Sequence, residues 1–217
     1  MIEFSLFDKL RPGNSLLLLG AHSDDIEIGC GGTLNKLLAE RSDLNIFWVV
    51  LSASGEREKE ARSSADGMLA SAETSDIRIL NFRNGFFPYV ATDIKEYFES
   101  LKKLPTPDII LTHYKHDAHQ DHRIVSELTW NTFRDHLILE YEIPKYDGDL
   151  GSPNLFVPLT SEQLKAKQKH LMKHFRSQHD KQWFTEDTFA SICRLRGIEC
   201  NSPTGFAEGF YVRKMLV

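Results

Sequence analysis

The chain has 217 residues, of which 41% are hydrophobic and 26% are charged, and its formal net charge at pH 7 is -5. A chain of this length and composition can bury a core of its own, so we expect a single domain over residues 1–217. The acidic balance argues against a nucleic-acid partner, because such proteins usually carry an excess of basic residues.

Three further features concern the compartment. The longest apolar run near the N-terminus, residues 16–19, is far shorter than a bilayer span, so no membrane span is expected. The first ten residues lack the basic flank and long apolar stretch of a signal peptide. The three cysteines form no CxxC pair, which favours a reducing compartment over a disulfide scaffold. We therefore predict a cytoplasmic protein.

The first half of the chain alternates between strand and helix patterns. Short apolar runs at residues 15–21, 45–51, 77–80 and 108–113 predict strands buried on both faces. Apolar residues at helical spacing lie between them, for example Ile94, Tyr97, Phe98 and Leu101. This βαβαβαβ order predicts a parallel sheet with right-handed crossovers.

The second half continues the alternation less regularly. The apolar residues in 124–128, 164–175 and 189–193 predict helices, and residues 137–143 and 206–217 predict strands. Residues 144–158 are rich in proline and glycine and predict a long loop that could cover a site. The fold class we expect is α/β, with a Rossmann-like, mostly parallel sheet flanked by helices on both faces.

The first cluster of reactive residues, His-Ser-Asp-Asp, follows the first predicted strand. His22 and Asp25 are close enough for one turn of chain to bring both side chains onto one ion, and imidazole and carboxylate both bind zinc. Asp24 should then point elsewhere and be free to act as a base. The alternative is that these residues only cap the helix that follows.

The second cluster follows the fourth predicted strand and holds four histidines and two aspartates within residues 113–123. Histidine is the commonest metal ligand and the usual acid or base near neutral pH. His113 or His116 alone could be a polar residue at a strand end, and Asp117 could orient a neighbour. If the strand order is 3-2-1-4, both clusters meet in the crevice where the winding of the sheet reverses, which is where ligands bind in such folds.

At these residues the chain resembles the LmbE-like deacetylases, relatives of the enzyme that deacetylates N-acetylglucosaminyl phosphatidylinositol. The resemblance is carried by AHSDD at 21–25, GCGGT at 29–33 and HQDHR at 119–123. Weaker echoes are Ser54-Gly55-Glu56, Arg62, Ser177-Gln178 and Ala207-Glu208-x-Phe210, whereas residues 146–173 match poorly. The chain departs from the family pattern at Ser23, commonly proline, and at Ile26, often glutamate.

The resemblance implies a role for each matched residue. His22, Asp25 and His122 would bind Zn²⁺, with water completing the coordination. Asp24 would be the general base, His119 would polarise the carbonyl or protonate the leaving amine, and Asp121 would support His119. The chemistry is consistent, because three protein ligands leave one zinc position open for water.

Other signals have simpler explanations. The glycines at 29, 31 and 32 lack the GxGxxG spacing of a dinucleotide loop and are interpreted as sites of close backbone packing. The basic run 165–176 is typical of a solvated helix face, with contact to a substrate phosphate as the alternative. Arg62 and Arg123 are candidates for binding substrate, with pairing to a structural carboxylate as the alternative. Phe86, Phe87 and Tyr89 are assigned to the core rather than to a wall for a sugar ring.

The function we predict is zinc-dependent removal of the N-acetyl group from an N-acetylated sugar or sugar conjugate. The alternatives are another metal-dependent hydrolase, acting on a phosphoester or an amide, and a sugar- or nucleotide-binding module that has lost catalysis. The expected partner is a small molecule, and a homo-oligomer is compatible with the sequence.

Overall fold

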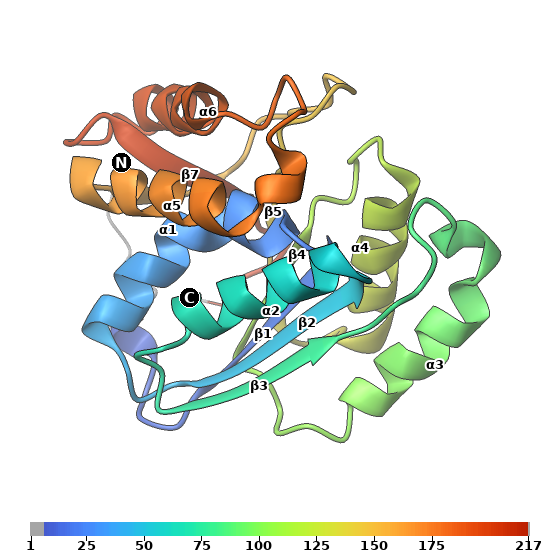
Figure 1. Ribbon diagram of the computed structural model, residues 1–217. Helices are drawn as coiled ribbons and strands as arrows, with labels where there is room; N and C mark the ends of the chain where they lie inside the picture. The colour runs from blue at the N-terminus through green and yellow to red at the C-terminus, as the bar shows by residue number, and fades with distance from the viewer. Residues whose placement is uncertain (1–6, 217) are drawn as a thin grey trace.

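The computed structural model describes residues 7–216 and contains one sheet of seven strands with helices on both of its faces (Figure 1). The strand order is β3-β2-β1-β4-β5-β7-β6. The strands are β1 (Ser15–His22), β2 (Asn45–Ser52), β3 (Thr74–Ile79), β4 (Ile109–His113), β5 (Leu137–Tyr141), β6 (Leu155–Leu159) and β7 (Phe206–Tyr211).

The six α-helices follow the strands nearly in alternation, as the sequence predicts. They are α1 (Asp25–Glu40), α2 (Glu56–Met68), α3 (Ala91–Leu101), α4 (Gln120–Thr132), α5 (Ser161–His174) and α6 (Glu186–Glu199). Three short 3-10 helices, η1 (Phe7–Lys9), η2 (Phe87–Tyr89) and η3 (Arg176–Gln178), complete the described elements. Within the described residues no helix is both long enough and apolar enough to cross a membrane.

The five strands from β3 to β5 are parallel, which confirms the predicted α/β class and the order 3-2-1-4 of the first four strands. The second half completes a mostly parallel sheet, as predicted, and departs from the prediction in the loop expected at residues 144–158. β7 pairs antiparallel with β5 on one side and with β6 on the other. Residues 155–158 of the predicted loop, together with Leu159, form β6. β6 is an edge strand, and an edge strand tolerates Pro158 because one side of it has no partner strand to which an amide would have to donate.

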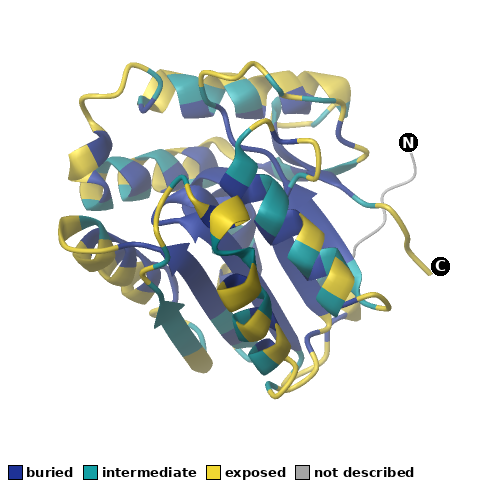
Figure 2. Cartoon of the chain, turned by 90° about the vertical axis from the view of Figure 1, so that its right-hand side faces the viewer, coloured by how far each residue is buried: buried dark blue, intermediate teal, exposed yellow. Residues whose placement is uncertain are grey.

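The sheet separates two apolar layers, as the dark band of buried strands in Figure 2 shows. In β1, Leu16 and Leu18 pack with α1, α2, α5 and α6, whereas Leu17 and Leu19 pack with α3 and α4. Side chains alternate along a strand, so β1 fills both layers with the unbroken apolar run from Leu16 to Leu19. This burial fixes the strand end that carries His22.

Helix α1 is kinked at Cys30, whose φ of -142° and ψ of 15° are not helical. The kink frees backbone groups, and a buried ion pair satisfies them. The Glu208 carboxylate accepts hydrogen bonds from the amides of Gly32 and Thr33, at 2.8 and 2.6 Å. Lys167 Nζ lies 2.6 Å from both Glu208 and the carbonyl of Ile28.

The two glycines on either side of the kink show why no side chain is tolerated there. A Cβ at Gly29 would lie 2.2 Å from the ring of Tyr141, and one at Gly32 would lie 2.5 Å from Leu159. The predicted explanation, close packing near the site, therefore holds for these two glycines but not for Gly31, where a Cβ would lie no closer than 3.7 Å to its neighbours. Lys167 departs from the predicted solvated face of the basic run, because it is buried against Glu208.

Candidate metal centre and active site

The two predicted clusters meet at the carboxyl ends of β1 and β4. His22 is the last residue of β1 and Asp25 is the first of α1. His122 lies in the first turn of α4, which follows β4 after a short loop. Because β1 and β4 are neighbours in the sheet, residues a hundred positions apart come into contact.

The three expected ligand atoms form a compact triangle. His22 Nδ1 lies 3.2 Å from His122 Nε2 and 3.4 Å from Asp25 Oδ2, and the third side, from His122 Nε2 to Asp25 Oδ2, is 3.6 Å. Atoms bound at 2.0–2.2 Å to one tetrahedral zinc ion are separated by about 3.3–3.6 Å. The types of donor atom and their spacing therefore fit a zinc ion.

Each histidine of the triangle has a carboxylate partner on its other ring nitrogen. His22 Nε2 lies 3.2 Å from Asp121 Oδ2, and His122 Nδ1 lies 2.9 Å from Asp117 Oδ2. Such partners fix the orientation of a metal-binding imidazole and raise its basicity. This agrees with the interpretation that Asp117 orients a neighbour.

The expected contact between Asp121 and His119 is not what the structure shows. The carboxylate of Asp121 is occupied by His22 and by the amides of Gly85, at 2.6 Å, and Phe87, at 3.1 Å. Its contact with His119 is through the backbone, where the Asp121 amide donates to His119 Nδ1 at 3.2 Å. Asp121 therefore lies behind His22 rather than behind His119.

His113 contacts two members of the triangle, His122 and Asp25. Its ring is fully buried and stacks on His122 at a centroid distance of 3.9 Å, with Nε2 3.2 Å from Asp25 Oδ2. The same nitrogen lies 2.9 Å from the amide of Ala21 and 3.3 Å from the hydroxyl of Tyr141. His113 is thus a polar residue at a strand end whose polar contacts are all on Nε2, while its buried Nδ1 has no hydrogen-bond partner among the described residues, so the interpretation of His113 as a satisfied residue is only partly met.

Burial and the neighbouring charges shift the pKa values of the cluster in opposite directions. Burial would lower the pKa of His22, but the carboxylates of Asp25 and Asp121 outweigh it and raise that pKa to about 9. Burial lowers the pKa of His122 to about 3, which keeps this imidazole neutral, the form that binds a metal. The pKa of Asp25 is held well below its usual value, because the three surrounding histidines outweigh the effect of burial.

Asp24 faces the adjoining cavity and pairs with an arginine that the sequence analysis did not single out. Arg57, in the first turn of α2, places Nη2 2.9 Å from Asp24 Oδ1 and Nε 2.9 Å from the hydroxyl of Ser23. Burial raises the pKa of Asp24 despite this pairing. A carboxylate held in this way is a stronger base than an exposed one.

The two arginines proposed for substrate binding lie elsewhere. Arg62 is exposed on α2 and does not line the cavity. Arg123 donates to the backbone carbonyls of Asp117 and Ala118, and so holds the loop before α4. Arg57, five positions before Arg62 and next to the Ser54-Gly55-Glu56 motif, occupies the position expected of Arg62.

His119 caps the N-terminus of α4 and lies over the triangle. Its ring stacks on His122 at 4.6 Å and meets His22 edge-on at 4.9 Å. Because Nδ1 accepts the amide of Asp121, the neutral ring carries its proton on Nε2. Burial, together with His22, lowers the pKa of His119.

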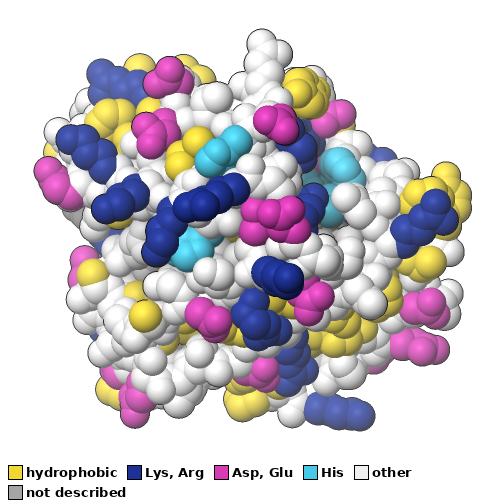
Figure 3. All heavy atoms as spheres, in the orientation of Figure 1, with side chains coloured by type: hydrophobic (Ala, Val, Ile, Leu, Met, Phe, Trp, Pro, Cys, Tyr) yellow, Lys and Arg dark blue, Asp and Glu magenta, His cyan; other side chains and the backbone are white. Residues whose placement is uncertain are grey.

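The cluster opens into a cavity of about 240 Å³. The 144–158 segment contributes to its wall, as the lid interpretation predicts, and further residues come from loops after β3 and η3. The lining residues are His22, Asp24, Asp25, Arg57, Asn84, His119, His122, Ile143, Lys145, Tyr146, Asp147, Lys181 and Trp183. The basic side chains of α5, on the face shown in Figure 3, do not line this cavity.

Residues 17–133 match the family model described as PIG-L: GlcNAc-PI de-N-acetylase. The matched stretch is more than half of the chain and contains both clusters that build the site. The chain belongs to the PIG-L family. This confirms the resemblance read from the two motifs.

Two further comparisons concern a curated protein and a solved structure. The uncharacterized deacetylase YaiS of Escherichia coli K12 is 27% identical over 185 residues, which cover 80% of this chain and 97% of YaiS. The N,N'-diacetylchitobiose deacetylase of Pyrococcus horikoshii has the same fold, with a TM-score of 0.68 at 21% identity over 96% of this chain and 87% of that chain.

The same fold is also found in an enzyme of another class. GalB, the 4-carboxy-2-hydroxymuconate hydratase of Pseudomonas putida KT2440, has a TM-score of 0.66 at 15% identity over 94% of this chain and 98% of that chain. The fold of PIG-L proteins therefore does not by itself select the reaction, and the chemistry has to be argued from the site.

Proposed function

We propose that the protein is a zinc-dependent deacetylase that removes the N-acetyl group from an N-acetylated sugar or sugar conjugate. The observation that carries the proposal is the triangle of His22, Asp25 and His122, whose ligand atoms are 3.2–3.6 Å apart. Membership of the PIG-L family supports N-deacetylation over the other hydrolytic reactions that one metal ion could assist.

His22, Asp25 and His122 would hold the ion, with Asp121 and Asp117 behind the two histidines. Zinc bound there would activate a water molecule and polarise the acetyl carbonyl. A closely spaced second metal, as in many phosphoesterases, would need further carboxylates. The other acidic residues of the cavity wall, Asp24 and Asp147, do not join the triangle, and Asp24 is paired with Arg57.

Two side chains of the cavity would take part in proton transfer and hydrogen bonding during the reaction. The Asp24 carboxylate, held by Arg57, would accept the proton of the attacking water. His119, with its Nε2–H beside the triangle, would donate a hydrogen bond to the developing oxyanion, and Asp24 would pass the proton taken from the water to the leaving amine. A pure binding module would need neither group, which favours catalysis.

The other side chains of the cavity wall suit the ring of a sugar. Trp183 and Tyr146 offer aromatic surface to the apolar face of a sugar, and Asn84, Asp147 and Lys181 offer partners for its hydroxyls. Lys181 Nζ lies 5.6 Å from the Trp183 ring. This combination of aromatic and hydrogen-bonding side chains supports a sugar substrate over an apolar amide.

The proposal is tested by metal analysis and acetate release together. Protein purified without added metal is expected to contain about one zinc per chain and to release acetate from at least one member of a panel of N-acetylated sugars. Chelation should abolish acetate release, and added Zn²⁺ should restore it. Acetate release that persists in metal-free protein would overturn the metal mechanism, and hydrolysis of phosphoesters alone would overturn the deacetylase assignment.

A further inference from the structure

One lysine on the wall of the metal cavity, Lys145, directs its ammonium into the protein. Its side chain is 9% exposed, and its Nζ lies 3.0 Å from Oδ2 of Asp117 and 2.5 Å from Oδ2 of Asp149. The carbonyl of Ile143 is a third acceptor, at 3.4 Å. An ammonium has three protons to donate, so these acceptors leave none for a substrate.

The two carboxylates that Lys145 joins each accept a backbone amide of the loop between β4 and α4. Oδ1 of Asp117 accepts the amide of His119 at 2.7 Å, and Oδ2 of Asp149 accepts the amide of Ala118 at 2.5 Å. Two successive amides of the loop are thus fixed through one ammonium. Because the loop ends at His119, the N-cap of α4, the position of that imidazole depends on them.

Asp117 connects the same ammonium to a second histidine of the site. Its Oδ2, the oxygen that contacts Lys145, also lies 2.9 Å from Nδ1 of His122. A carboxylate with fixed partners on both oxygens holds a single orientation, and it holds the ring it contacts with it. Lys145 therefore bears on His119 and His122 through carboxylates rather than by hydrogen bonds of its own.

The charge of Lys145 separates two like charges. The contacting oxygens of Asp117 and Asp149 are both within 3.0 Å of Nζ, and their side chains are only 2% and 12% exposed. Without the ammonium, the two carboxylates would repel each other where little water can screen them. Moving apart, they would release the amides of Ala118 and His119.

We propose that Lys145 is a positioning residue of the deacetylation, which holds the loop before α4 so that His119 is directed at the reacting carbonyl. The inference rests on the proposed function, because it assigns Lys145 to that reaction. The effect of Lys145 should fall on kcat rather than on KM, since its protons are all donated within the protein.

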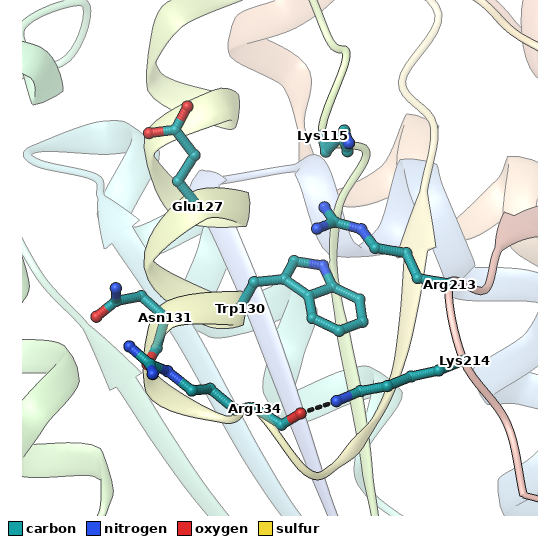
Figure 4. A pocket seen from close by; sticks show the side chains of 7 residues that line it. All are labelled: Lys115, Glu127, Trp130, Asn131, Arg134, Arg213 and Lys214. Atoms are coloured by element: carbon teal, nitrogen blue, oxygen red, sulfur yellow. Dashed lines mark hydrogen bonds between the residues drawn. The ribbon is translucent and has the colours of Figure 1, made fainter.

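Steady-state measurement of acetate release tests this assignment. Lys145→Met, which keeps the length of the side chain without its charge, should lower kcat by about 10–100-fold and leave KM within about twofold. Lys145→Met/Asp149→Asn removes the repulsion while the asparagine oxygen can still accept the Ala118 amide, so kcat should recover by about threefold or more. The matched control is Lys115→Met, in the same loop. Its side chain lies with Trp130 at a separate hollow (Figure 4) and should leave kcat within about twofold.

Calorimetric titration with acetohydroxamate, a small zinc-binding analogue of the acetyl group, tests Lys145 without turnover. At saturating Zn²⁺, loss of the His119 hydrogen bond should weaken acetohydroxamate binding by about tenfold in Lys145→Met. Because no reaction is required, this titration separates a failure of the Lys145 assignment from a failure of the proposed function.

Melting temperatures of all three variants verify that each is folded. Wild-type kcat and wild-type acetohydroxamate affinity in Lys145→Met would overturn the proposal. A rise in KM at unchanged kcat would overturn it as well, because Lys145 would then be a substrate contact. A double variant no more active than Lys145→Met would overturn the account of two carboxylates held apart by one ammonium.

Discussion

The Asp121 carboxylate lies 3.2 Å from Nε2 of His22, although the two residues are 99 positions apart. The same carboxylate accepts the amides of Gly85 and Phe87 in the segment between β3 and α3. The orientation of the His22 imidazole therefore depends on three separate segments, which meet only because β1 and β4 are adjacent in the sheet.

We predict that Asp121→Asn lowers zinc affinity by about 10–100-fold, because the amide cannot support the His22 ring as the carboxylate does. Competition with a chelator of known affinity measures the change. Asp117→Asn should act in the same direction through His122. If Asp121→Asn lowers turnover while zinc affinity stays at the wild-type value, the residue acts on His119 after all.

The proton-transfer roles predict variants that keep the metal and lose the reaction. Asp24→Asn preserves the shape of the loop but removes the base, and kcat should fall by about 10²–10⁴-fold with little change in KM. His119→Ala should behave similarly, through loss of the donor. Zinc content of each purified variant is the control. Loss of zinc from Asp24→Asn would make Asp24 a ligand and reverse its assignment with Asp25.

The pairing of Arg57 with Asp24 predicts a contrast between two arginines of the same helix. Arg57→Gln should lower kcat by about 10–100-fold, the equivalent of one charge-assisted hydrogen bond that orients the base. Arg62→Gln, on the exposed side of α2, serves as the matched control and should change kcat by less than about twofold. Equal losses in both variants would point to an effect on α2 as a whole.

The parallel half of the fold was predictable because its strands are buried on both faces and leave continuous apolar runs. β7 falls within the strand predicted at residues 206–217, whereas β6 was missed, because a short strand at a sheet edge that contains a proline carries a weaker pattern. Phe87 is buried as expected, but Phe86 and Tyr89 are 37% and 76% exposed, and so were wrongly assigned to the core. Aromatic type alone does not show which side of a 3-10 turn faces outward.

The site was predictable as far as local spacing determines it. His22, Asp25 and His122 follow strands that the topology makes neighbours, so their meeting could be anticipated. The carboxylate that contacts each imidazole is determined by side-chain directions across the crevice, which the sequence does not show. For this reason Asp121 was expected to contact the His119 ring, whereas its carboxylate contacts His22. Arg57 was missed because one arginine among several charged residues on a helix gives no periodic signal.

The buried ion pair beneath the kink of α1 predicts a large loss of stability when it is broken. Lys167→Met leaves the Glu208 carboxylate buried without its cation, and the free energy of unfolding should fall by about 3–5 kcal/mol in denaturant titration. Lys169→Met, an exposed neighbour on α5, is the control and should lie within about 0.5 kcal/mol of wild type. Lys167→Met/Glu208→Gln should recover part of the loss, and a loss below about 1 kcal/mol in the single variant would contradict this account.

His170, on α5, predicts how stability depends on pH. Burial, together with the nearby His174 and Lys173, lowers the pKa of His170 from 6.5 to about 4, while its Nε2 lies 2.8 Å from the hydroxyl of Ser64. Between these two pKa values the unfolded chain binds a proton that the folded protein does not, so the free energy of unfolding should decrease as pH falls from 6.5 towards 4. The ring is only partly buried, and we expect its share of the decrease to be about 2 kcal/mol at most. Comparing His170→Gln with wild type by denaturant titration at both ends of this range isolates that share, with the exposed His116→Gln as control. The same pH dependence in His170→Gln and wild type would show that other groups carry the effect.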